Sequence, residues 1–203
     1  WKNRLKNKNL KKKIADYLLT ENSKINGVIS TTIVGSFMDQ ENFSDIDIVI
    51  ICKKLSKEVF LKCVGRSKEI RNNIKELKQY NIKINSTFGP LKFYGKKQII
   101  IHLMIYDLKG HVKHVLKSPF TCFDWEKSKL NTGIPLKKIC SVNKLQISDF
   151  IRTRRGTYKY LNDIKSNKIS YRKYVWERKK YTEKEFKKKM NSKDQIEFCY
   201  HII

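Results

Sequence analysis

The chain has 203 residues, of which 40% are hydrophobic and 11% aromatic, and its formal net charge is +26. This size and composition exclude a disordered chain and predict one folded domain with its own core. The charge predicts a surface that attracts RNA, DNA or nucleotides. Lysine far outnumbers arginine and stands beside many Asn and Ile residues, so the codon bias of an AT-rich genome explains the charge equally well.

Cysteine usage and hydropathy bear on where the protein works. The five cysteines are odd in number and form no Cys-x-x-Cys pair, which is typical of reduced thiols. No apolar run approaches the roughly 18 residues of a membrane span, and the basic N-terminal stretch lacks the apolar core of a secretion signal. We therefore expect a cytoplasmic protein without a membrane partner.

The first predicted elements are a helix and two strands. Residues 4–21 place leucine and isoleucine at helical spacing between lysines, which predicts a basic amphipathic helix. Residues 28–34 are rich in β-branched side chains and end at Gly35, which predicts a strand. Residues 45–52 begin with alternating Asp and Ile and become wholly apolar. This pattern is typical of a strand with one end at a polar site and the other in the core.

Helices and further strands follow. Ser56 is a candidate N-cap for a helix, and a second helix is predicted near residues 68–79. Residues 82–88 alternate, Gly89-Pro90 predicts a turn, and residues 98–106 are nearly all apolar, so a hairpin is expected. The order of elements predicts an α+β fold, a mixed sheet with helices on one side.

The C-terminal part shows weaker signals. A short helix is predicted at residues 110–116 and a longer one at 148–165. The tail from 168 to 193 is rich in lysine and arginine with aromatic residues between them. We therefore expect one domain at 1–118 and a mainly helical, basic extension at 119–203 packed on it.

One constellation carries chemistry. Gly35 and Ser36 follow a predicted strand, and Asp45 and Asp47 open the next one. Glycine lets the backbone approach a phosphate closely, and amides with a serine hydroxyl at a turn form an anion cradle. The two aspartates are two apart on a strand, so their side chains leave the same face, with Cα atoms about 7 Å apart. Both can then reach a pair of divalent ions, for which Mg²⁺ or Mn²⁺ suits oxygen ligands.

This block resembles the Gly-Ser … Asp-x-Asp signature of the DNA polymerase β-like nucleotidyltransferases, over roughly residues 27–107. The resemblance implies the nucleotidyltransferase fold, with Ser36 holding the triphosphate of a bound NTP and Asp45 and Asp47 ligating both metal ions. It also implies a third acid on a later strand that binds the catalytic ion.

The sequence departs from that pattern at the third acid. The position expected for it on the strand at 98–106 is occupied by His102, and the nearest carboxylate is Asp107. Asp107 lies five residues further on, an odd offset that puts it on the opposite face of a regular strand. Three alternatives remain: a bulge brings Asp107 into the site, His102 is an unusual ligand, or catalysis has been lost.

Other charged and aromatic residues suggest weaker sites. His111 and His114 are three apart and could share a metal, although solvated histidines are the simpler interpretation. Arg152, Arg154 and Arg155 are candidate ligands of nucleotide or RNA phosphates, or a solvated charged turn. In the basic tail, rings could stack on bases while lysines contact phosphates, or the rings could dock the tail on the core.

Two functions follow. The first is a metal-dependent nucleotidyltransferase that moves a nucleoside monophosphate from an NTP to a hydroxyl acceptor, for which the basic surface favours RNA. The second is a catalytically degenerate nucleotidyltransferase-fold protein that binds RNA or a larger assembly.

Overall fold

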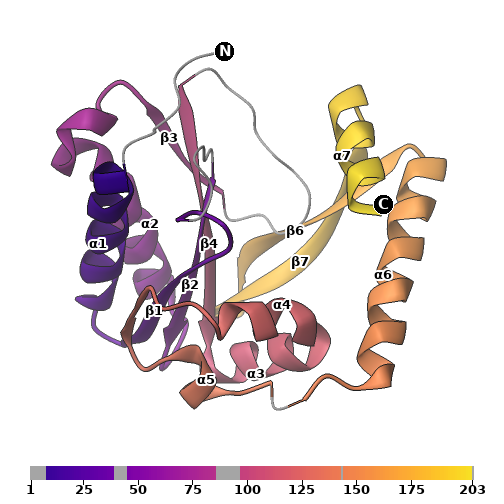
Figure 1. Ribbon diagram of the computed structural model, residues 1–203, viewed down its shortest axis with the longest axis horizontal. Helices are drawn as coiled ribbons and strands as arrows, with labels where there is room; N and C mark the ends of the chain where they lie inside the picture. Colours follow the sequence, from indigo (N-terminus) through magenta and orange to yellow (C-terminus); the bar gives the residue numbers. More distant parts are fainter. Residues whose placement is uncertain (1–7, 39–44, 86–96, 143, 203) are drawn as a thin grey trace. The chain divides into compact units, whose positions relative to one another are not determined.

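The chain forms two compact units, shown in a computed structural model that describes residues 8–38, 45–85, 97–142 and 144–202 (Figure 1). The first unit ends at Val142 and the second contains the residues from 143 onward. The boundary expected near residue 118 is therefore displaced, because the short strand at 131–133 pairs with the first strand of the sheet. Among the described residues, none of the helices has the length and apolar character needed to cross a bilayer.

The first unit contains helices and strands close to those predicted. Its elements are α1 (Lys8–Ser23), β1 (Val28–Val34), β2 (Asp45–Cys52), α2 (Lys57–Asn73), the 3-10 helix η1 (Lys75–Leu77), β3 (Asn81–Asn85), β4 (Gln98–Asp107), α3 (Leu108–Lys117), α4 (Pro119–Trp125), β5 (Asn131–Gly133) and α5 (Leu136–Ile139). Ser56 caps α2 as predicted, since its side chain accepts a hydrogen bond from the Val59 amide. The helix does not break at Gly65, so the first half of the second predicted helix belongs to α2.

The five strands form one mixed sheet in the order β3-β4-β2-β1-β5. β1 is antiparallel to β2 and β5, whereas β4 is parallel to both β2 and β3. The predicted hairpin of β3 and β4 is therefore wrong. A parallel pair needs a connection of about a dozen residues, and the chain between these strands has that length. The Gly89-Pro90 turn lies outside the described residues.

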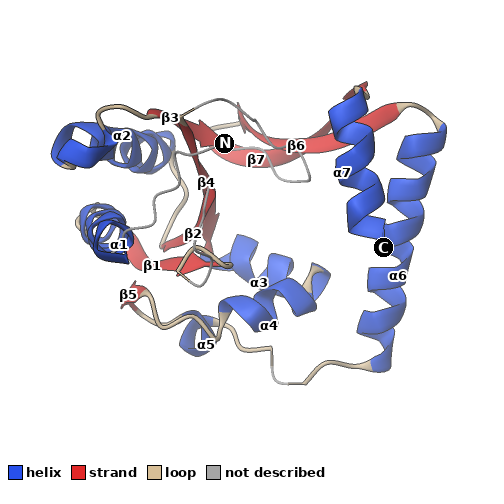
Figure 2. Ribbon diagram, turned by 45° about the horizontal axis from the view of Figure 1, so that its top comes forward, coloured by secondary structure: helices blue, strands red, loops and turns tan. Residues whose placement is uncertain are grey.

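The two faces of the sheet differ in what covers them. Residues 48–52 of β2 are fully buried, so both faces of the central strand are covered there. Figure 2 shows α1 and α2 on one face and α3 and α4 on the other. The prediction of helices on one side only is therefore wrong. A strand with apolar side chains on both faces must be covered by other elements on both faces of the sheet.

The second unit is smaller and contains two strands that the sequence did not predict. Its described elements are α6 (Ile147–Lys165), β6 (Lys168–Glu177), β7 (Lys180–Lys189) and α7 (Ser192–Ile202). Its core consists of Ile169, Met190 and Phe198, with Tyr160, Ile164 and Tyr171 packed around them. The helix at 148–165 is confirmed, but the tail after it begins with an antiparallel hairpin rather than helix.

The turn of the β6–β7 hairpin is strained because two residues that carry a Cβ adopt positive φ. Arg178 and Lys179 connect Glu177 to Lys180, and their φ angles are 47° and 60°. Positive φ at both central residues defines a type I′ turn, which favours Asn-Gly. A residue with a Cβ costs about 1 kcal/mol or more in this conformation.

We predict that Lys179→Gly stabilises the hairpin by about 1 kcal/mol, because glycine accepts positive φ without strain. Hydrogen exchange of the β6 and β7 amides should slow by a corresponding factor of about five. Lys179→Ala is the matched control, since it removes the same charge but keeps a Cβ. Equal slowing in the two variants would show that charge, not backbone strain, is responsible.

Candidate metal and nucleotide site

The candidate site begins where β1 ends, at Gly35. The antiparallel register pairs Val34 with Asp47, so the chain leaves the sheet directly beside that carboxylate. Gly35 has φ of 74°, and a Cβ placed on it would lie 3.0 Å from Asp47 Oδ2. Only glycine fits this turn without strain or displacement of the carboxylate. The structure thus brings Gly35 and Asp47 into one site, with Ser36 exposed on the same turn.

Asp45 and Asp47 lie at the half-exposed end of β2. Both are partly accessible, whereas Ile46 and Ile48 between and beyond them are buried. Strand alternation puts the two aspartates on one face and the isoleucines on the other. The carboxylates therefore keep contact with solvent while the strand stays anchored in the core.

The parallel pairing of β2 with β4 places His102 opposite Asp47. Residues in register on neighbouring strands project from the same face, so His102 lies on the face that carries both aspartates. His102 is also partly exposed. The structure therefore brings His102 beside the aspartate pair, at the position where the resemblance implies an acid.

Asp107 lies at the other end of β4. The register pairs it with Cys52, five positions from the Asp47–His102 pair, or about 16 Å along the strand. Its carboxylate caps α3, since Oδ1 accepts a hydrogen bond from the Gly110 amide at 2.7 Å. Burial, together with the nearby Asp107 charge, raises the pKa of Cys52 to about 12. No bulge between β2 and β4 brings Asp107 to the aspartate pair.

Residues not singled out in the sequence hold the turn after β1 in place. Phe37 is 3% exposed, and the ammonium group of Lys11 lies 5.9 Å from its ring centroid. Ser128 donates a hydrogen bond to the Ile33 carbonyl, and the Ile33 amide donates to Leu130. Only the apolar character of Phe37, directly after Gly-Ser, signals such an anchor in the sequence. Ser128 lies too far along the chain for local pattern to identify it.

The donor set suits a hard divalent cation. Carboxylate oxygens on one strand face are the ligands that Mg²⁺ or Mn²⁺ prefers, so Asp45 and Asp47 fit such an ion. Across the parts of the chain that the structure describes, no group of three or more His, Cys, Asp or Glu side chains forms a complete metal-binding cluster. The site therefore offers two acidic ligands and a histidine on the adjacent strand.

His111 of α3 is buried and His114 is only partly exposed, contrary to the simpler interpretation of the sequence that both are solvated. His111 is 1% exposed, and neither of its ring nitrogens has a hydrogen-bond partner among the described residues. His114 stacks between Tyr106 and Trp125, with ring centroids 5.1 Å from each. Burial lowers the pKa of His111 below its usual value. The pair belongs to the packing between β4, α3 and α4.

The three arginines lie in the second unit, near the start of α6, and all are exposed. Arg152 lies 3.8 Å from the Asp149 carboxylate, one turn earlier in the helix. Arg154 and Arg155 add to the basic surface of this helix.

We predict that Gly35→Ala lowers the free energy of unfolding of the first unit by about 1–2 kcal/mol, because alanine is strained at this φ and meets Asp47. Urea titration followed by circular dichroism measures the loss. Gly65→Ala is the matched control. Gly65 lies in α2 with open space around it, so alanine there should stabilise by about 0.5–1 kcal/mol. A neutral effect at Gly35 would contradict the close contact.

A second prediction concerns pH. Because the folded-state pKa of His111 is lowered from 6.5, the unfolded chain binds this proton more readily, and stability should fall as pH drops below about 6.5. His111→Leu removes this dependence, so its stability curve between pH 7.5 and 5 should be flatter than that of the parent protein. The free energy of unfolding is measured by urea titration of both proteins across this pH range. If it falls equally with pH in the parent and in His111→Leu, His111 does not contribute to the pH dependence.

Comparison with models of known protein families, with curated proteins and with solved structures finds no match to this chain. The function must therefore be argued from the site itself.

Proposed function

We propose that this protein is a metal-dependent nucleotidyltransferase that moves a nucleoside monophosphate from an NTP to a hydroxyl acceptor. The observation that carries the proposal is how closely the Gly35 turn approaches the Asp47 carboxylate, since a Cβ placed on Gly35 would lie 3.0 Å from Asp47 Oδ2. A phosphate cradle and an acid pair are thereby adjacent at one strand end. A solvated Asp-x-Asp strand edge with an unrelated Gly-Ser turn would not need this juxtaposition.

The residues of the turn would bind the phosphates. Positive φ at Gly35 turns the backbone sharply at the end of β1, and successive amides in such a turn form a concave anion site. The exposed Ser36 adds a hydroxyl donor. In the transfer, the acceptor oxygen forms a bond to the α-phosphorus as the bond to the β-phosphate oxygen breaks. Pyrophosphate leaves, and the hydroxyl proton is lost.

Asp45 and Asp47 would hold the divalent cation. When bound, Mg²⁺ or Mn²⁺ would lower the pKa of the acceptor hydroxyl and neutralise charge on the leaving pyrophosphate. Both carboxylates project from the half-exposed face of β2, so a cation and a substrate can reach them from solvent. His102, in register with Asp47, is the nearest group to accept the hydroxyl proton or to add a ring-nitrogen ligand.

RNA is the acceptor that the charge favours. A net charge of +26 creates a positive potential that concentrates polyanions near the surface. An acceptor with a phosphate backbone is attracted by that potential, whereas a neutral small molecule is not.

One observation favours a second function, a degenerate nucleotidyltransferase fold that binds RNA without transfer. The position opposite Asp47 holds His102 instead of an acid. The nearest carboxylate in sequence, Asp107, is engaged in capping α3. A site that has lost its third acid would show this arrangement.

The test is incubation with each α-³²P-labelled NTP, Mg²⁺ or Mn²⁺, and total RNA. We expect label transfer by the parent protein, and a loss of roughly a thousandfold or more in Asp45→Asn and Asp47→Asn, because each removes a charged metal ligand. Asp124→Asn is the control, since Asp124 is exposed and forms its ion pair among the described residues with Lys127, just after the end of α4. Equal rates in the Asp47 and Asp124 variants would refute the assigned site.

Variants at two further positions decide the third ligand. Asparagine caps helices as well as aspartate does, so Asp107→Asn should keep both fold and rate if Asp107 is only a cap. His102→Ala should reduce the rate if the imidazole takes part. A parent protein inactive with all four nucleotides, together with activity in His102→Asp, would establish the degenerate function instead.

A further inference from the structure

The second unit contains a lysine-lined concavity next to the turn between α6 and β6. It has a volume of about 450 Å³ and is lined by Ser166, Asn167, Lys168, Lys187, Lys188 and Lys189. All six residues come from two short segments, the start of β6 with the turn before it and the end of β7. We refer to this feature as the lysine pocket.

The lysines of the pocket are not equivalent. Lys188 forms an ion pair with Asp194 of α7 at 3.1 Å, and Asp194 is buried. Lys168, Lys187 and Lys189 have no ion pair with any described residue. Elsewhere in this unit, Lys159 and Lys184 pair with Glu185 and Glu177. Among the residues that the structure describes, three ammonium groups in the pocket therefore have no neutralising carboxylate, whereas other lysines nearby have one.

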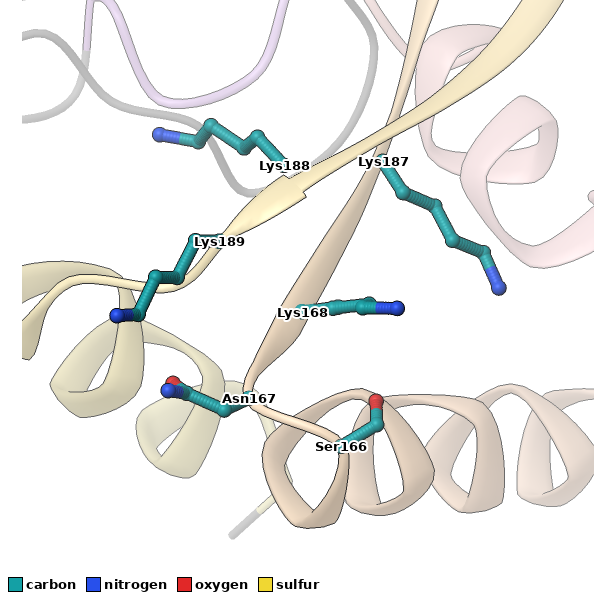
Figure 3. Close-up of a pocket in the computed structure, with 6 residues that line it drawn as sticks. All are labelled: Ser166, Asn167, Lys168, Lys187, Lys188 and Lys189. Atoms are coloured by element: carbon teal, nitrogen blue, oxygen red, sulfur yellow. The ribbon is translucent and has the colours of Figure 1, made fainter.

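Strand pairing places these lysines at neighbouring backbone positions. The register places Lys168 directly opposite Lys189. Lys187 precedes Lys189 by two residues and therefore lies on the same face of β7. Like charges directly opposite each other on neighbouring strands destabilise the pair. Figure 3 shows that the side chains of Lys168 and Lys189 diverge, whereas Lys168 and Lys187 extend to the same side as Ser166. An anion on that side would neutralise part of the charge of Lys168 and Lys187.

Aromatic rings continue the same face of the hairpin. Alternation along β6 puts Tyr174 and Trp176 on the face of Lys168, and the register pairs Trp176 with Tyr181. The Trp176 and Tyr181 ring centroids are 5.1 Å apart, and Trp176 is 37% exposed. From Lys168 to Trp176 the strand spans eight residues, or about 26 Å. One face thus offers unpaired ammonium groups at one end and an accessible ring pair at the other.

We infer that this face of the β6–β7 hairpin binds single-stranded RNA, with backbone phosphates in the lysine pocket and bases stacked on Trp176. Lysine contacts phosphates without regard to sequence, and any base stacks on an aromatic ring. An acidic protein would use the ammonium groups but not the rings, and duplex RNA keeps its bases stacked within the helix. The choice of RNA rests on the proposed function, in which RNA is the acceptor, whereas the binding face itself does not require transfer.

The test measures binding of the full chain to a fluorescein-labelled, unstructured 20-nucleotide RNA by anisotropy, in EDTA and without NTP. For the triple variant Lys168→Gln, Lys187→Gln and Lys189→Gln we expect at least tenfold weaker binding at 100 mM salt. The slope of log K against log salt should become shallower by about 2, since each single-strand phosphate contact contributes about 0.7. Trp176→Leu should weaken binding roughly tenfold with the slope unchanged.

The matched control is Lys12→Gln, Lys57→Gln and Lys68→Gln, which removes the same charge from exposed positions in the first unit. It should retain most of the parent affinity and slope. An equal loss in both triple variants would overturn the inference in favour of a diffuse charge effect. Tighter binding of duplex RNA than of single-stranded RNA would also overturn the inference. The same holds for binding of phosphatidylserine vesicles without binding of RNA. Hydrogen exchange of the hairpin amides verifies that every variant is folded.

Failures of the two proposals are distinguishable. If the lysine-pocket variant binds RNA as tightly as the parent while label transfer persists, the inference fails and the proposed function stands. If RNA binding depends on the pocket but no NTP is used, the inference stands and the degenerate function replaces transfer.

Discussion

The pairing of β1 and β4 on either side of β2 is the constraint on which the candidate site depends. Antiparallel pairing ends with Val34 opposite Asp47, so the chain must turn away at Gly35 against a carboxylate. Parallel pairing on the other side sets His102 opposite the same aspartate. A register shift of one residue in either pair would move the side chains to opposite faces of the sheet. The site is therefore a consequence of strand register more than of loop conformation.

The burial of β2 explains why the acids are at its end. From Ile48 to Cys52 the strand has no exposed surface, and an unpaired carboxylate in that segment would lose its hydration without compensation. Asp45 and Asp47 avoid this because their face is only partly covered at that end of the strand. Ile46 and Ile48 alternate with the aspartates and are buried on the opposite face of the strand. One short strand thus provides both a core anchor and accessible charge.

Local sequence pattern predicted the helices and strands that bury a distinct apolar stripe. The prediction failed where pairing strands are distant in sequence and where a strand has no apolar stripe. The strands before Gly35 and from Asp45 to Cys52 were predicted because β-branched runs are bounded by polar residues. The parallel pairing of β3 with β4 is a non-local choice that no local pattern encodes. β6 and β7 were missed because lysines occupy both faces of β7 and hide the period of two. The cap formed by Asp107 depends on where β4 ends, which spacing alone did not show.

The composition of the chain could not separate codon bias from selection for a polyanion, but the positions of its lysines bear on the question. Codon bias adds lysines without regard to their neighbours. Lysines that pair with glutamate or aspartate on the surface contribute little to stability, so they do not distinguish codon bias from selection. Lys168 opposite Lys189 is different, since the strand register puts two like-charged residues at directly facing positions, an arrangement that does not favour strand pairing. The placement of these lysines on the hairpin face that also carries an accessible ring pair, more than the total of +26, is the basis on which we propose RNA as a partner.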